Sequence, residues 1–121
     1  NKVILCSGKI YFDLLEAREK YKRRDVVLLR IEQLYPFPAK SLVKSIKPYA
    51  KNAEFIWCQE EPKNMGAWSH VRDYIQWTLD FIKANNKNVS YIGRAPAASP
   101  ATGYAKRHVA QQKEILEKVF N

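Results

Sequence analysis

Short apolar runs alternate with longer amphipathic segments along this chain. The apolar runs have the length and the β-branched or aromatic content of strands: Val3–Cys6, Val26–Ile31, Glu54–Gln59 and Val89–Ile92. The longer segments repeat apolar residues with the period of a helix: about Lys9–Arg23, Ala39–Ile46, Ala67–Ala84 and Tyr104–Phe120. This alternation predicts an α/β domain with a mainly parallel sheet of four or five strands and helices on both faces.

In a parallel sheet the loops that follow the strands meet along one edge, where ligands usually bind. The least common residue combinations of the chain lie in these predicted loops: Ser7-Gly8, Glu32–Pro38, Glu60–Gly66 and Gly93–Gly103. Function is therefore expected at this edge.

The predicted helix over residues 67–84 carries a wide apolar arc. Val71 and Ile75 lie near its centre, and Tyr74, Trp77 and Phe81 widen it to roughly 200°, more than a one-sided surface helix needs. Two interpretations stay open. Either the helix is sunk deep in its own core, or the three aromatic side chains cover a neighbouring domain.

The length and composition are those of one globular domain. The chain has 121 residues, of which 46% are hydrophobic, and a formal net charge of +9. Its first residue is Asn1 and its one methionine is Met65, which predicts that residues 1–121 form a single domain of a larger multidomain protein.

The positive charge is divided along the chain. Residues 1–52 carry 12 basic and 5 acidic residues (+7), residues 53–82 carry 2 and 5 (−3), and residues 83–121 carry 7 and 2 (+5). A basic nucleic-acid-binding module is one alternative, but no RNA- or DNA-binding motif accompanies the charge. We expect no nucleic-acid partner. The longest stretch without charged residues, Ala95–Ala105, is too short to cross a membrane.

No set of residues predicts catalysis by this chain. Ser7-Gly8-Lys9 lacks the first glycine of a phosphate-binding loop, and His70 and His108 have no metal-ligand spacing. Adjacent strand residues point to opposite faces, so Glu60 and Glu61 are not expected to share a site. We therefore assign no catalytic, cofactor-binding or metal-binding residue.

The two cysteines, Cys6 and Cys58, each end an apolar run. Free cysteine in such a place behaves as a small buried hydrophobe. Two unpaired thiols fit a reducing compartment better than a structural disulfide does.

The loop residues resemble the C-terminal end of the first component of 2-oxoglutarate dehydrogenase. The resemblance covers essentially the whole chain, and these segments carry it: Leu5–Lys9, Arg30–Pro38, Trp57–Pro62 with Asn64 and Gly66–Trp68, Gly93-Arg94, Ala98–Ala101 and Gly103. Several long motifs in order make it specific.

The resemblance implies a transketolase-like, thiamine-diphosphate-dependent enzyme. Such an enzyme oxidatively decarboxylates 2-oxoglutarate and passes the succinyl group to the lipoyl arm of a succinyltransferase, as part of the tricarboxylic acid cycle. It is a homodimer in which thiamine diphosphate and Mg²⁺ lie between earlier domains. The C-terminal domain is then expected to brace the dimer, to bind neither group and to be inactive alone. Bacterial cytoplasm and mitochondrial matrix both fit.

Residues of the loop edge that combine aromatic or arginine anchors with fixed turns are candidates for contacts with a neighbouring domain or subunit. These are Tyr35, Pro36, Phe37, Glu61, Asn64, Trp68 and Arg94. An alternative for Tyr35–Phe37 is a rigid loop packed on its own sheet. Some family members bind a regulatory nucleotide or acyl-coenzyme A, and the basic candidates for such an anion are Arg30, Lys63, Arg94 and Arg107.

Overall fold

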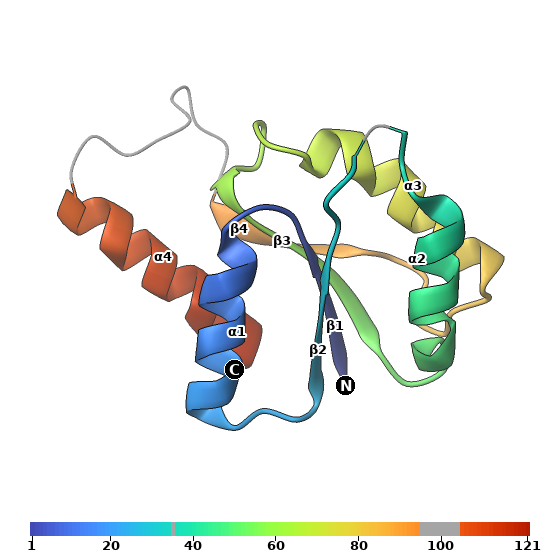
Figure 1. Cartoon of the computed structure of the whole chain (residues 1–121), viewed down its shortest axis with the longest axis horizontal. Helices are drawn as coiled ribbons and strands as arrows, with labels where there is room; N and C mark the ends of the chain where they lie inside the picture. Colours follow the sequence, from blue (N-terminus) through green and yellow to red (C-terminus); the bar gives the residue numbers. More distant parts are fainter. Residues whose placement is uncertain (35, 95–104) are drawn as a thin grey trace.

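The computed structural model describes residues 1–34, 36–94 and 105–121, with side chains from residue 109 in the last segment. Figure 1 shows its helices and strands, which follow each other in the predicted order. Their bounds are β1 Lys2–Cys6, α1 Ile10–Tyr21, β2 Val26–Arg30, α2 Ala39–Ile46, the 3₁₀ turn η1 Lys47–Tyr49, β3 Glu54–Pro62, α3 Trp68–Phe81, β4 Ser90–Arg94 and α4 Ala105–Phe120.

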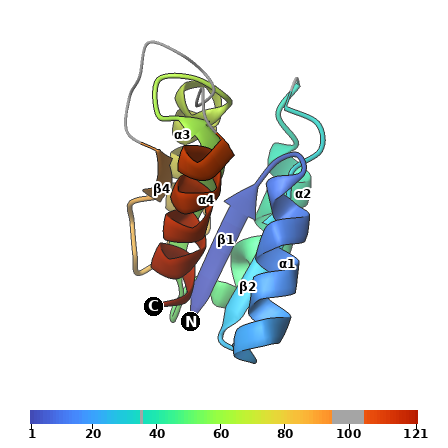
Figure 2. The ribbon, with the colours of Figure 1, turned by 90° about the vertical axis from the view of Figure 1, so that its left-hand side faces the viewer.

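The four described strands form one parallel sheet in the order β2-β1-β3-β4. Helices α1 and α4 cover one face and α2 and α3 the other, to the left and right of the sheet in Figure 1; in Figure 2, α1 and α4 lie in front. The predicted parallel α/β fold is confirmed. Within the described residues, no helix combines the length and apolarity that a membrane crossing requires.

Two predicted strand ends are wrong. Gly93 and Arg94 were expected in the loop that follows the last strand, but they end β4. Residues 60–62 were expected to begin a loop, but β3 continues to Pro62, which pairs with Arg94 of β4. The register shifts between Cys58 and Pro62. Pro62 lacks a backbone N–H, and a proline is tolerated where a strand ends and its pairing is irregular.

Each face of the sheet has its own core. Alternate residues of β3 point to opposite faces, so Phe55 and Trp57 join the α2/α3 core while Ile56 and Cys58 join the α1/α4 core. The helices supply Leu42, Val71, Ile75 and Leu79 on the first side and Ile10, Leu14, Ile115 and Val119 on the second.

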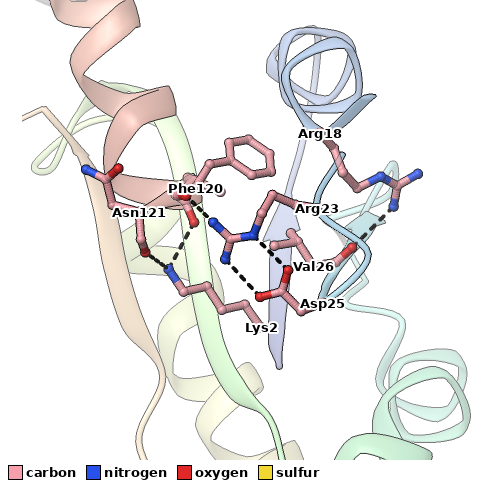
Figure 3. Close-up of polar contacts among 8 residues, drawn as sticks. Lys2, Arg18, Arg23, Asp25, Val26, Phe120 and Asn121 are labelled. Carbon is pink, nitrogen blue, oxygen red and sulfur yellow. Dashed lines mark hydrogen bonds and ion pairs between the residues drawn. The ribbon is translucent and has the colours of Figure 1, made fainter. Parts of the chain in front are cut away.

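Two cations fasten the end of α4 to β1 and to the turn after α1 (Figure 3). Lys2 Nζ donates to the carbonyls of Val119 and Asn121, each at 3.0 Å, and Arg23 donates to the carbonyl of Phe120. Arg23 also pairs with Asp25 at 2.8 Å, and this hydrogen bond lowers the pKa of Asp25 to about 2. Cations at a helix C-terminus satisfy its last carbonyls and its negative dipole.

Candidate functional site

The candidate site lies where β1 and β3, neighbours in the sheet, lead to helices on opposite faces. Helix α1 follows β1 onto one face, and α3 follows β3 onto the other. Crevices in parallel sheets form at such switch points. A cavity of about 390 Å³ lies here, lined by Ser7, Gly8, Leu34, Trp57, Gln59, Glu61, Gly66, Ala67 and His70.

The buried amide of Gln59 organises this edge. Its side chain is 2% exposed, and its Oε1 accepts hydrogen bonds from Trp57 Nε1 at 2.9 Å and from the backbone N–H of Trp68 at 3.1 Å. Its Nε2 donates to the carbonyls of Pro62 at 2.9 Å, Met65 at 2.8 Å and Glu61 at 3.2 Å. We call these contacts the Gln59 network. These hydrogen bonds fix the turn after β3 and cap the N-terminus of α3. They also give every polar atom of the amide a partner.

Two glycines let the backbone approach the Gln59 network closely. Gly66 has φ +67°, and a Cβ there would lie 3.2 Å from Gln59 Oε1. At Gly93 a Cβ would lie 2.7 Å from the Gln59 carbonyl oxygen and would also meet the Tyr91 hydroxyl. That hydroxyl donates to the carbonyl of Arg94 at 2.8 Å, and burial raises the pKa of Tyr91 to about 12.

Ser7-Gly8 forms the tight turn expected between β1 and α1. Gly8 has φ +82°, with nothing within 4 Å of an added Cβ, so glycine is favoured by the backbone conformation and not by crowding.

The adjacent carboxylates point to opposite faces, as predicted. Glu60 lies 3.7 Å from Lys9 Nζ on the α1 side. Glu61 lines the cavity on the α3 side, where it lies beside Gly66. His70, also at the cavity, contacts the Leu34 carbonyl through Nε2 at 2.8 Å.

The predicted contact residues differ in exposure. Pro36 and Asn64 are exposed, Glu61 and Arg94 are half-buried, and Trp68 is 8% exposed within its own core. Phe37 is half-buried and stacks on Tyr74 with ring centroids 5.0 Å apart. Tyr35 lies outside the described residues. Apart from Tyr35, these positions lie at or beside the strand-end edge, and the contact role of all seven stays a prediction.

Of the described basic candidates, Lys63 and Arg94 are neighbours and Arg30 lies apart from them. Arg30 ends β2 and Arg94 ends β4, three strand spacings or about 14 Å apart. Arg30 pairs with Glu32 at 2.5 Å and lies over the Phe12 ring at 4.9 Å. Lys63 lies near Arg94, with its Nζ over the Tyr91 ring. The side chain of Arg107 is outside the described part of the chain.

Both cysteines are free and buried, as expected. Burial raises the pKa of the Cys6 thiol to about 12, although Arg30 opposes this, and burial raises the pKa of Cys58 further. Among the described residues, no three His, Cys, Asp or Glu side chains form a group that could hold a metal ion.

Gln59, the organising residue of this edge, is not among the residues predicted to form the site. Its signal was a single polar residue at an inward-facing position of β3, two residues beyond Trp57 and two before Glu61. An amide buried at a strand end requires several partners, and a loop that folds back on the strand can provide them.

Fold and site together define a class of protein: a parallel α/β domain whose strand-end edge is built from internal hydrogen bonds around one buried amide. The chain belongs to the 2-oxoglutarate dehydrogenase C-terminal family, whose model matches residues 1–120. This confirms the resemblance of the loop motifs.

Curated relatives agree with this family. The chain is 55% identical over 116 residues to the 2-oxoglutarate dehydrogenase E1 component of Brucella anthropi, and equally to that of Brucella ovis. The match covers 96% of this chain and 12% of each relative. The chain thus corresponds to about an eighth of the relatives' length.

Two pairs of charged residues at this edge do not form a site for Mg²⁺ or thiamine diphosphate, the groups that the resemblance implies. Glu60 and Glu61 lie on opposite faces, so they offer no convergent carboxylates to a cation. Arg30 pairs with Glu32 and lies over the Phe12 ring, and two strands separate it from Arg94.

Proposed function

We propose that this chain is the C-terminal domain of an enzyme that oxidatively decarboxylates 2-oxoglutarate, and that it supplies contacts, not reacting groups. In this proposal other domains hold thiamine diphosphate and Mg²⁺, and the succinyl group passes to a lipoyl succinyltransferase in the bacterial cytoplasm or the mitochondrial matrix. The 55% identity to E1 components supports the enzyme.

The rigidity that the Gln59 network gives to the strand-end edge is the observation that supports the contact role. The amide of Gln59 is fully used within the domain and holds the turn after β3 in one conformation. A rigid edge loses little conformational entropy on association, so it is suited to a permanent interface. Phe37 and Glu61 flank this edge and, in the proposal, contact the second subunit of a homodimer.

The test uses the full-length enzyme with Phe37→Ala and Glu61→Gln, and with Phe12→Ala as the control. Phe12 is 55% exposed on the opposite face. We expect the dimer dissociation constant to rise about tenfold for each edge variant, equivalent to about 1.4 kcal/mol, with kcat per assembled dimer unchanged. An unchanged dissociation constant would contradict the brace.

A second assay tests where the chemistry resides. The isolated chain, supplied with thiamine diphosphate, Mg²⁺ and 2-oxoglutarate, should release no CO₂ above a protein-free control. Measurable decarboxylation would overturn the assignment of the reacting groups to other domains.

A further inference from the structure

An exposed aromatic stripe runs along the outer side of α3. Tyr74, Trp77 and Phe81 are 46%, 53% and 61% exposed, and Trp77 stacks on Phe81 with centroids 5.3 Å apart. We call these three residues the aromatic stripe. The interpretation that the helix buries them in its own core is therefore wrong for this chain.

The aromatic stripe occupies one side of α3 only. Seen down the helix, the three residues fall within about 60° of each other at 100° per residue. The other exposed side carries Arg72, Asp73 and Asp80. Exposed aromatic surface of this kind, on the order of 300 Å² for three half-exposed rings, is typical of an interaction site when it is contiguous.

The stripe covers the second half of α3, about 10 Å of helix from Tyr74 to Phe81. Phe37 stacks on Tyr74 and so joins it to the strand-end edge. At the other end, Asn85 beyond α3 donates from its backbone N–H to the carbonyl of Ala50 at 2.8 Å. Glu54, four residues after Ala50, donates from its backbone N–H to the carbonyl of Asn1 at 2.9 Å. Phe81 therefore lies at the edge where the chain enters the sheet.

The family and the relatives point to the occupant. The family is described as C-terminal, and the match covers 12% of each relative, so most of a relative's length precedes the matched segment. A polypeptide that leads into Asn1 arrives at the edge of the sheet where β1 begins, and α3 ends at this same edge.

We infer that the aromatic stripe is the docking surface for the preceding domain of the same polypeptide. This inference rests on the proposed function, because it requires the chain to be part of a larger enzyme. It adds a second contact, distinct from the strand-end edge proposed for the second subunit.

The test is site-specific photo-crosslinking in the purified full-length enzyme. p-Benzoylphenylalanine replaces Phe81, or Phe12 as the control, and the dimer is assembled from mixed light and heavy isotope-labelled chains. We expect position 81 to cross-link to a segment upstream of Asn1, light to light and heavy to heavy, at least fivefold more than position 12. Light-to-heavy cross-links would identify a second copy, and yields equal to position 12 would identify an exposed surface; either result overturns the inference.

A pair of double variants separates this inference from the proposed function. Trp77→Ala with Phe81→Ala should speed proteolytic release of the domain about tenfold and leave the dimer dissociation constant unchanged. Asp73→Ala with Asp80→Ala, on the polar side of the same helix, should change neither. A release rate equal to that of the polar-side control would contradict the docking surface, whereas the dimer brace would still be judged by Phe37 and Glu61.

Discussion

The two faces of the sheet are closed in different ways. The α1/α4 core is mainly aliphatic, with Phe120 and two buried thiols, and its outer helix is fastened by Lys2 and Arg23 to the sheet and the turn after α1 (Figure 3). The α2/α3 face is built around Trp57, Trp68 and the Gln59 network, and it leaves three aromatic residues uncovered.

Both faces expose large apolar side chains, and the difference lies in what accompanies them. On the α1/α4 side, Phe12 lies beneath Arg30 at 4.9 Å and Tyr21 beside Lys20 at 5.7 Å, whereas on the α2/α3 side Trp77 and Phe81 stack on each other. On the α1/α4 side, the last carbonyls of α4 are satisfied by cations of the same chain. On the α2/α3 side, the buried amide of Gln59 is satisfied, and Tyr74, Trp77 and Phe81 lie exposed along one side of α3. When a partner covers an exposed apolar surface, the free energy falls because that surface is removed from water. An exposed charge has no such gain.

The largest expected effect comes from removing the amide of the Gln59 network. Gln59→Leu leaves the indole N–H of Trp57 and the backbone N–H of Trp68 without their acceptor. We expect a loss of about 3 to 5 kcal/mol in the free energy of unfolding, measured by urea titration. Cys58→Ala, one residue away on the other face, should cost about 1 to 2 kcal/mol. Equal losses would remove the distinction between the faces.

Alanine substitutions at two glycines should give the next largest losses of stability. Gly93→Ala places a Cβ 2.7 Å from the Gln59 carbonyl oxygen, so we expect a loss of about 2 to 3 kcal/mol from overpacking. Gly8→Ala meets no atom and strains only its φ of +82°, so its cost should be about 1 kcal/mol. Thermal unfolding of both variants checks the order, and the reverse order would contradict the crowding at Gly93.

Lys2→Met tests the fastening of α4. The substitution removes the hydrogen bonds to the carbonyls of Val119 and Asn121 but keeps the aliphatic stem. We expect a loss of about 1 kcal/mol, seen as faster amide hydrogen exchange in the last turn of α4 with α3 unchanged. Equal changes in both helices would show that the two faces unfold together.

The smallest effect at neutral pH concerns the thiols. The folded pKa of Cys6, about 12, lies above the value near 8.5 of an unfolded thiol. Stability is therefore complete below about pH 8.5 and falls as the pH rises towards 12, because only the unfolded state ionises readily. Iodoacetamide at pH 8 should modify neither Cys6 nor Cys58 in the folded chain, as mass spectrometry would show, and rapid modification would contradict their burial.

The strands and helices followed from local pattern, because each apolar run or helical period is fixed by neighbouring residues. The end of β3 did not, since Pro62 stays in the strand through its pairing with Arg94, which is 32 positions away. The sheet order likewise depends on contacts between distant segments.

The candidate site was predictable as an edge but not as a network. The loop motifs placed Phe37 and Glu61 near each other on topology alone. Gln59 could be recognised only when the turn after β3 brought the carbonyls of Pro62 and Met65 to its amide. Trp68 and Trp77 both lie on the apolar arc, but Trp68 is buried and Trp77 is exposed. The sequence did not distinguish them, because the width of an apolar arc does not show how deeply the helix packs into the core.

Hydroxyl-radical footprinting of the assembled full-length enzyme tests the contrast between the faces most directly. Trp77, Phe81 and Phe12 have similar exposures within this domain, at 53%, 61% and 55%. After correction for intrinsic reactivity, we predict that Trp77 and Phe81 are oxidised at least fivefold more slowly than Phe12. Oxidation of all three at rates within about twofold would contradict the account, because the α2/α3 face would then be as open to water in the enzyme as the α1/α4 face.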